Sequence, residues 1–425
     1  MQVRKKPVIF TNFGGLNFIH EFIKSIDFDN KVLKYLGHRS AQATYSYGDI
    51  LSQLTYTKFI GGGVLDDHNE LRDQMENHPD LKIASPDTIE YSFQELKQAT
   101  EVQDAKNGST HSINTHDGFN RLLPFLCSHL GLVSKEAEHM MDYDGHIVEN
   151  NKRDNAFTYK KTEGYYPVMC SINKFPVYMQ NRNGNTPEGY GQLPIIKTAI
   201  KECKENGIQV SSFRADACCY ERATIEWLQE EGITYYIRAE QSMRLLDALE
   251  AEDEWTPAII GDRRVEVCSI KEALFTKHTS YRIVAYREKK KGQQSIHNRN
   301  GYSFHAVVTS DYKSSPLECI KTYNQRGCQG EHHFKELDND FDLKRLPFDS
   351  FEMNTIYIYA MIVSYLLFNA CKKKYSKKLT FVGIEMRLKR FILHFVSLPA
   401  KWISTGRSKV LNIYTTKNYE PIYQT

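Results

Sequence analysis

The order of predicted strands and helices between residues 137 and 240 constrains this fold more than any other feature of the sequence. Short β-prone runs predict strands, and apolar residues that recur every three or four positions predict helices. We expect strands at 139–144, 165–172 and 176–181, a helix at 193–205, a strand at 208–213, a helix at 221–231 and a strand at 234–238. This alternation favours an α/β fold with an open sheet.

Two aspartates lie at the ends of expected strands. Asp144 ends the first strand, and Asp216 directly follows the fourth. In open α/β sheets, polar residues near the ends of neighbouring strands converge on one crevice. Three strands, a helix and a fourth strand have the connectivity of the ribonuclease H fold, so we expect a catalytic core of that type. Asp142 is an alternative to Asp144, because residues two apart point to the same side of a strand.

Different patterns flank this core. Residues 1–125 are expected to be mainly helical, with short helices at 67–75 and after Ser85-Pro86-Asp87 that fit a DNA-binding helix-turn-helix. The polar stretch 103–114 resembles a linker. Strand signals dominate a β-rich insertion at 241–312, and helical patterns resume in the last part of the core, 313–370. Residues 371–425 form a basic C-terminal region that we expect to be helical.

Composition limits the class of protein. A chain of 425 residues is expected to contain several structural units. Its one long apolar stretch, about 355–370, is shorter than the ~20 residues that a bilayer requires, so it predicts a buried helix and no membrane partner. The nine cysteines form no repeated CxxC pair and are expected to be reduced thiols. The N-terminus resembles no signal peptide, so we expect a cytoplasmic, nucleoid-associated protein.

Charge is distributed unevenly along the chain. The net charge is only +3, but residues 371–425 contain twelve Lys or Arg residues against two acids. A cationic segment with aromatic residues interleaved suits a phosphate backbone, although a solvated helix face has the same composition. The basic run Lys289, Lys290 and Lys291 offers a further site for DNA, with a solvated loop as the alternative.

A third acid, Glu331, lies in an expected helix that also carries Tyr323, Arg326 and Lys335. Phosphodiester cleavage and strand transfer need an activated nucleophile and a stabilised leaving oxygen, and two Mg²⁺ ions supply both. Such hard cations bind carboxylate oxygens. Asp144, Asp216 and Glu331 come from three segments that the expected fold brings together. They are therefore candidate ligands for two Mg²⁺ ions, with Mn²⁺ as a substitute.

Three motifs resemble those of bacterial insertion-sequence DDE transposases that carry a β-rich insertion in a ribonuclease H-like domain. MDYDGHIVEN (141–150) is similar to the strand of the first catalytic Asp, and FRADACCYERATIEWLQEEGITYYIRA (213–239) to the second. YNQRGCQGEHHFKELD (323–338) resembles the C-terminal signature, in which Tyr, Arg, Glu and Lys recur along one helix. The resemblance implies that Asp144, Asp216 and Glu331 are catalytic metal ligands.

The same resemblance implies roles in DNA binding. Tyr323 and Arg326 would contact DNA phosphate, and the forked donors of Arg suit that task. Lys335 is a further candidate on this helix. Trp255, inside the insertion, would stack on a flipped base, unless it is a packing residue. His332 and His333 beside Glu331 are expected at the surface or against DNA rather than on a metal.

The sequence departs from the signature in two ways. Four residues separate Arg326 from Glu331 where three are usual, and we expect a small bulge to absorb the extra residue. The usual Lys is replaced by Asp338, so its interaction with phosphate is either absent or supplied by Lys335 or Lys344. In the first motif, the small or polar residues Gly145-His146 favour Asp144 over Asp142.

These features together predict a DNA transposase. It would bind terminal inverted repeats and target double-stranded DNA as a homodimer, and would cut and rejoin the element by a cut-and-paste route. Two alternatives remain open at the level of sequence: a nuclease of the same fold without strand transfer, and an inactive DNA-binding repressor.

Overall fold

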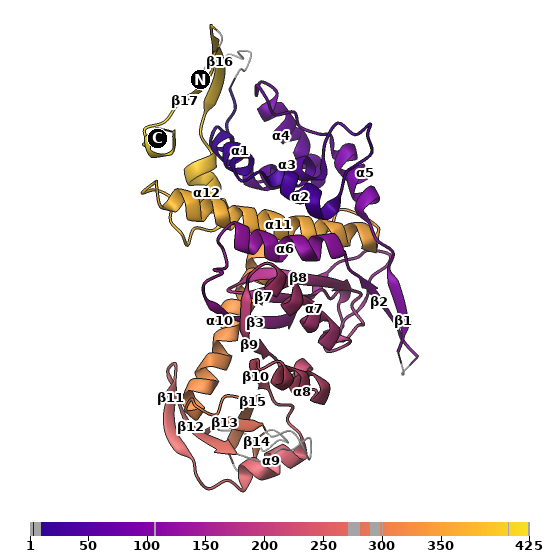
Figure 1. The fold of residues 1–425 in the computed structure, drawn as a ribbon, viewed down its shortest axis with the longest axis vertical. Helices are drawn as coiled ribbons and strands as arrows, with labels where there is room; N and C mark the ends of the chain where they lie inside the picture. The colour runs from indigo at the N-terminus through magenta and orange to yellow at the C-terminus, as the bar shows by residue number, and fades with distance from the viewer. Residues whose placement is uncertain are drawn as a thin grey trace.

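The computed structural model describes residues 3, 10–105, 108–270, 281–289, 298–299, 301–406 and 408–423, with the backbone alone at 298, 299 and 328–332. A twelve-stranded sheet extends from the middle of the molecule to its lower end in the view of Figure 1. Its strand order is β1-β2-β8-β7-β3-β9-β10-β15-β13-β12-β11, with β14 paired to β15. The protein is therefore a mixed α/β protein with one large mixed sheet.

The centre of the sheet has the element order that the sequence predicts. It contains β3 (Glu138–Gly145), β7 (Val168–Ile172), β8 (Phe175–Arg182), α7 (Gln192–Glu205), β9 (Gln209–Ala215), α8 (Arg222–Glu230) and β10 (Thr234–Arg238). Asn173 and Lys174, both at positive φ, make the tight turn of the β7–β8 hairpin. β3, β9 and β10 pair in parallel, and β7 pairs antiparallel with both β3 and β8.

The β-rich segment extends this sheet. After α9 (Met243–Glu250), the strands are β11 (Thr256–Ile260), β12 (Arg263–Ile270), β13 (Arg282–Lys289), β14 (Asn298–Arg299) and β15 (Tyr302–Thr309). β15 pairs antiparallel with β10, so the segment continues the central sheet through backbone hydrogen bonds. Lys290 and Lys291, which the sequence suggests as DNA-binding residues, lie outside the described residues.

The N-terminal region is helical, as the sequence predicts. It contains α1 (Gly15–Ser25), α2 (Phe28–Leu36), α3 (Tyr47–Phe59), η1 (Leu65–Asp67), α4 (His68–Met75) and α5 (Pro86–Leu96). Ser85 caps α5 by accepting a hydrogen bond from the Thr88 backbone N–H. Residues 76–85 separate α4 from α5. This connection is longer than the turn of three or four residues in a helix-turn-helix, so α4 and α5 do not form that motif.

The prediction of a linker at 103–114 is wrong. This stretch contributes to a hairpin of β1 (Glu101–Asp104) and β2 (Thr110–Asn114), and β2 pairs with β8 at the edge of the sheet. Alternate side chains of β2 are buried, which a polar composition alone conceals. α6 (Asp117–His129) then covers β8. A small separate sheet follows β3 and consists of β4 (Val148–Glu149), β5 (Ala156–Phe157) and β6 (Glu163–Tyr165).

Two long helices connect the regions. α10 (Pro316–Asp340) runs from the β-rich segment to the centre of the sheet, and α11 (Phe351–Ser376) lies between the N-terminal helices and α6 (Figure 1). α11 is the only described helix long and apolar enough to cross a membrane, and its apolar part is almost entirely buried. The predicted buried helix is thus confirmed, although it is longer at both ends than the apolar run suggests.

The C-terminal region corrects the expectation of a helical segment. Only α12 (Leu388–Phe391), η3 (Ile392–Val396) and α13 (Glu420–Tyr423) are helical among its described residues after α11, and β16 (Ala400–Thr405) pairs with β17 (Ser408–Ile413) in a hairpin. This region packs against the start of the chain, where Gly14 donates a hydrogen bond to Leu398 O. A Cβ on Gly15 would lie 2.1 Å from Phe395 O, so glycine is required for this close approach.

Candidate carboxylate site at the ends of the parallel strands

Strand register places Asp144 and Asp216 next to each other. β3 and β9 are parallel with Tyr143 opposite Ala215, so the next residue of each chain segment is an aspartate at the same edge of the sheet. Asp144 is largely buried. Asp216 caps the short η2 helix (Ala217–Cys219), where its Oδ1 accepts a hydrogen bond of 2.8 Å from the Cys218 backbone N–H.

Asp142 has a different environment. Arg214 of β9 donates to both of its carboxylate oxygens, through Nε at 2.6 Å and Nη2 at 2.9 Å. Both side chains are almost completely buried. Nη1 of the same guanidinium donates to Thr322 O in α10 at 2.6 Å. Asp142 is therefore engaged in a bidentate ion pair that also fixes α10 against the sheet.

Asp144 contacts α10 one turn further along. Arg326 Nη2 lies 2.7 Å from Asp144 Oδ1, and both side chains are largely buried. Burial alone would lower the pKa of Arg326. The neighbouring Asp144, Tyr323 and Asp216 raise it by more than burial lowers it, so the pKa lies above its usual value and the guanidinium stays charged. Its Nε is buried and has no hydrogen-bond partner among the described residues. The site thus combines acidic side chains with the buried, positively charged guanidinium of Arg326.

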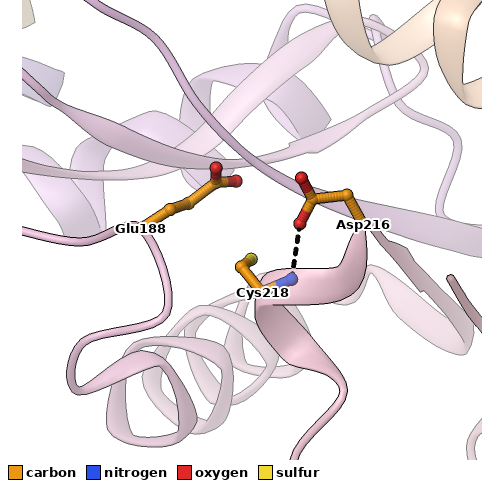
Figure 2. Close-up of side chains that lie close together, drawn as sticks. All are labelled: Glu188, Asp216 and Cys218. Carbon is orange, nitrogen blue, oxygen red and sulfur yellow. Dashed lines mark hydrogen bonds between the residues drawn. The ribbon is translucent and has the colours of Figure 1, made fainter. Parts of the chain in front are cut away.

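Glu188 is a third acid at this edge of the sheet, beside Asp144 and Asp216, and the sequence analysis missed it. Figure 2 shows its carboxylate facing Asp216, with Cys218 below both. One ligand atom from each of these residues lies within 4.8 Å of the others. Burial and the charge of Asp216 raise the pKa of Glu188. β8 runs in the same direction as β3, so the loop after β8 leaves the sheet at the same edge. That topology was the available signal for Glu188.

The Cys218 thiol differs from the carboxylates beside it. A hydrogen bond with Cys219, at 3.7 Å between sulfurs, and burial raise the pKa of Cys218. Sulfur is a soft ligand that hard divalent cations bind poorly. The donors that remain are carboxylate oxygens, which are the ligands that Mg²⁺ and Mn²⁺ prefer.

Asp338 joins α10 to His146 of the first motif. His146 Nε2 lies 2.9 Å from Asp338 Oδ1, and the imidazole ring stacks on Phe334 at 4.6 Å between centroids. Lys344 Nζ lies 3.1 Å from Asp338 Oδ2. Asp338, which replaces the Lys of the signature motif, therefore binds His146 through a hydrogen bond and Lys344 through an ion pair.

Glu331 lies in α10 between Arg326, which contacts Asp144, and Asp338, which contacts His146, but its side chain is outside the described residues. The side chain of His332 is outside them as well. α10 is a continuous α-helix from Pro316 to Asp340, so the small bulge expected between Arg326 and Glu331 is wrong. His333 is completely buried and packs against Phe334, which corrects its expected surface position.

The remaining predicted residues lie in varied positions. Tyr323 is half-buried, and burial raises its pKa. Lys335 is exposed on α10. The guanidinium of Arg287 covers the Trp255 ring at 4.3 Å, and the indole N–H donates to Glu252 O at 2.8 Å. These contacts fit Trp255 as a packing residue, and the stacking of its ring on a DNA base stays a prediction.

The fold and the site define an α/β protein with acidic residues at the ends of adjacent parallel strands and a long helix across them. The chain belongs to the family of transposases described as Transposase DDE domain group 1, whose model matches residues 9–425. This membership supports a transposase. No curated protein matches the sequence.

Two solved structures of transposases are similar to this chain at low identity. One is the piggyBac transposase synaptic complex with hairpin DNA, with a TM-score of 0.43 and 11% identity over 90% of this chain and 79% of that chain. The other is the Drosophila P element transposase strand transfer complex, with a TM-score of 0.24 and 13% identity over 52% of this chain and 43% of that chain.

Proposed function

We propose that this protein is an insertion-sequence DDE transposase of bacterial origin that cleaves DNA at the ends of its element and joins them to target DNA. The observation that carries the proposal is the pairing of β3 with β9, which brings Asp144 and Asp216 to one edge of the sheet. Family membership supports the same chemistry, because the match spans residues 9–425.

We also propose that the core is of the ribonuclease H type. The strand order β8-β7-β3-β9-β10 and the helix α7 between β8 and β9 support this assignment. The segment 241–312 is then an insertion between β10 and α10. The helix α10 carries Glu331, the last proposed acid of the site. The helical region 1–125 and the basic region 371–425 are proposed to contact DNA.

Asp144, Asp216 and Glu331 are proposed to hold two Mg²⁺ ions, for which Mn²⁺ can substitute. The oxygen donors fit such cations, and the soft sulfur of Cys218 does not compete with them. When bound, the ions activate the nucleophile and stabilise the leaving 3′-oxygen. Asp144 is favoured over Asp142, since the Asp142 carboxylate is engaged by two donors of Arg214. Glu331 precedes Asp338 by two helical turns, which places both positions on the same face of α10.

Residues of α10 are proposed to bind the DNA phosphate next to the cleaved bond. Arg326 already reaches the carboxylate site, and Tyr323 lies one turn before it. Their donors orient the phosphate and offset its negative charge. Lys344 is favoured over Lys335 as the replacement for the missing Lys, because its ammonium lies beside Asp338.

A basic cavity supports binding to the DNA backbone away from this site. Lys174, Lys372, Lys373 and Lys377 line a cavity of about 510 Å³ between the β7–β8 turn and the end of α11. Lys372 is buried and its Nζ donates a hydrogen bond of 3.1 Å to Met386 O, which leaves Lys174, Lys373 and Lys377 as the more accessible cations. Clustered ammonium groups of this kind favour a polyanion. Double-stranded DNA with the terminal repeats of the element is the proposed ligand, bound by a homodimer.

The test combines purified protein with Mg²⁺ and DNA that contains the sequences flanking the gene. We expect nicked and joined products from the wild type, and none from Asp216→Ala or Glu331→Ala, which should still bind DNA. Cleavage without joined product would support the nuclease instead. Binding without cleavage by the wild type in either Mg²⁺ or Mn²⁺ would support the repressor and contradict the proposal.

A further inference from the structure

Glu188 holds both residues that flank Asp144 in the sequence. Its Oε1 accepts a hydrogen bond of 2.9 Å from the Gly145 backbone N–H, and its backbone carbonyl accepts one of 2.7 Å from Tyr143 Oη. Its Oε2 accepts a third from Tyr166 Oη at 2.8 Å. The end of β3 that carries Asp144 is thus fixed to the loop between β8 and α7.

Two glycines allow this loop to approach the site so closely. A Cβ on Gly145 would lie 2.7 Å from the Tyr166 ring and 3.1 Å from the Glu188 carboxyl carbon. A Cβ on Gly189 would lie 2.7 Å from Cys218 O, in the turn that follows Asp216. One loop therefore packs against both the strand end with Asp144 and the turn with Asp216.

The loop itself is held rigidly. Arg182 is buried at the end of β8 and donates from Nη1 to Pro187 O and Glu188 O, both at 2.9 Å. These contacts leave the Glu188 carboxylate at a fixed place beside Asp216 (Figure 2). Two carboxylates this close repel each other, so a cation between them lowers the energy of the pair.

We propose that Glu188 is a positioning residue of the reaction centre, which fixes the Asp144 strand end and adds negative charge beside Asp216 that strengthens binding of the divalent cation. This inference rests on the proposed transposase function. It assigns two separable contributions to one side chain: hydrogen-bond acceptance, which Gln retains in part, and charge, which Gln lacks.

The experiment measures Mn²⁺ binding by the loss of the electron paramagnetic resonance signal of free Mn²⁺. We expect Glu188→Gln to raise the dissociation constant of the strongest site about tenfold, the effect of roughly 1.4 kcal/mol. The matched control is Glu202→Gln, which changes a buried acid in α7 and should leave Mn²⁺ binding unchanged. Unchanged binding by Glu188→Gln, or an equal loss in the control, would overturn the proposal.

DNA cleavage separates this inference from the proposed function. If the wild type cleaves, Glu188→Gln should need about tenfold more Mg²⁺ for half-maximal cleavage and reach a similar rate at saturation. No cleavage by Glu188→Gln at any Mg²⁺ concentration, with DNA binding intact, would make Glu188 essential and overturn its positioning role. If the wild type does not cleave, the proposed function fails, whereas the Mn²⁺ titration still tests Glu188.

Discussion

Two aspartates that share one face of β3 have different environments. Asp142 forms a buried bidentate ion pair with Arg214, whereas Asp144 contacts Arg326 from α10 at the edge of the sheet. The sequence predicts that both point to the same side, and it also favours Asp144. It does not reveal the partner of Asp142, because Arg214 is distant in sequence and meets it only through the parallel pairing of β3 with β9.

This difference predicts unequal effects of matched substitutions. Asp142→Asn leaves the Arg214 charge buried without its counterion, so we expect a loss of about 3–5 kcal/mol in the free energy of unfolding. Asp144→Asn should cost less, about 1 kcal/mol, because the Arg326 guanidinium keeps the neighbouring negative charges of Asp216 and Glu188. Urea denaturation of both variants measures the difference. Equal destabilisation would show that Asp144 is also a structural residue.

Local sequence patterns predict some of the helices and strands of this fold and miss others. The strands of the core, α7 and the capped α5 follow from apolar periodicity and from Ser85, so their existence was predictable. The β16–β17 hairpin pairs locally and was missed because the basic composition of residues 371–425 favoured a helix, whereas the β1–β2 hairpin was missed because β2 pairs with the distant β8. Glu188 was missed for the same reason: its role depends on which edge of the sheet its loop leaves.

Buried histidines make the N-terminal helical region sensitive to acid. His68 of α4 and His116 at the start of α6 are buried, and burial lowers the pKa of each to about 4. In the unfolded chain, histidine binds a proton as the pH falls through about 6.5. The folded state therefore loses stability as the pH falls from about 6.5 to 4, by ~1.4 kcal/mol per pH unit for each residue.

His68→Gln tests this dependence. We expect the free energy of unfolding of the variant to fall less steeply between pH 6.5 and 4 than that of the wild type, as measured by urea denaturation across that range. His129→Gln is the control, because His129 is exposed and its substitution should leave the slope unchanged. A wild-type stability that is constant over this range would contradict the buried neutral state of His68.

At the scale of the whole molecule, α11 packs the N-terminal helices against the layer of α6 and the sheet, and the two ends of the chain meet at Gly14 and Leu398 (Figure 1). The sequence indicates a basic C-terminal region but not its position. The structure brings three of its lysines together with Lys174 from the β7–β8 turn. Asp144 lies near the opposite end of β7, where it pairs with Met169.

This lysine cluster predicts a salt-dependent contribution to DNA binding. Replacing Lys174, Lys373 and Lys377 with Gln should reduce the slope of log K against log salt by about 0.9 for each phosphate that is no longer neutralised. The control replaces Lys197, Lys201 and Lys204, which are exposed on α7. Fluorescence anisotropy with labelled duplex gives both slopes. A slope that is the same for both triple variants would exclude the cavity as a DNA-binding surface.

Anomalous diffraction from crystals of the protein with DNA ends and Mn²⁺ tests directly whether the proposed carboxylates form the catalytic centre. We predict two Mn²⁺ peaks bounded by Asp144, Asp216 and Glu331, with the phosphate to be cleaved next to Arg326. Peaks at Asp142, or no Mn²⁺ at the ends of β3 and β9 while DNA is bound, would contradict the assignment of these carboxylates as the catalytic centre.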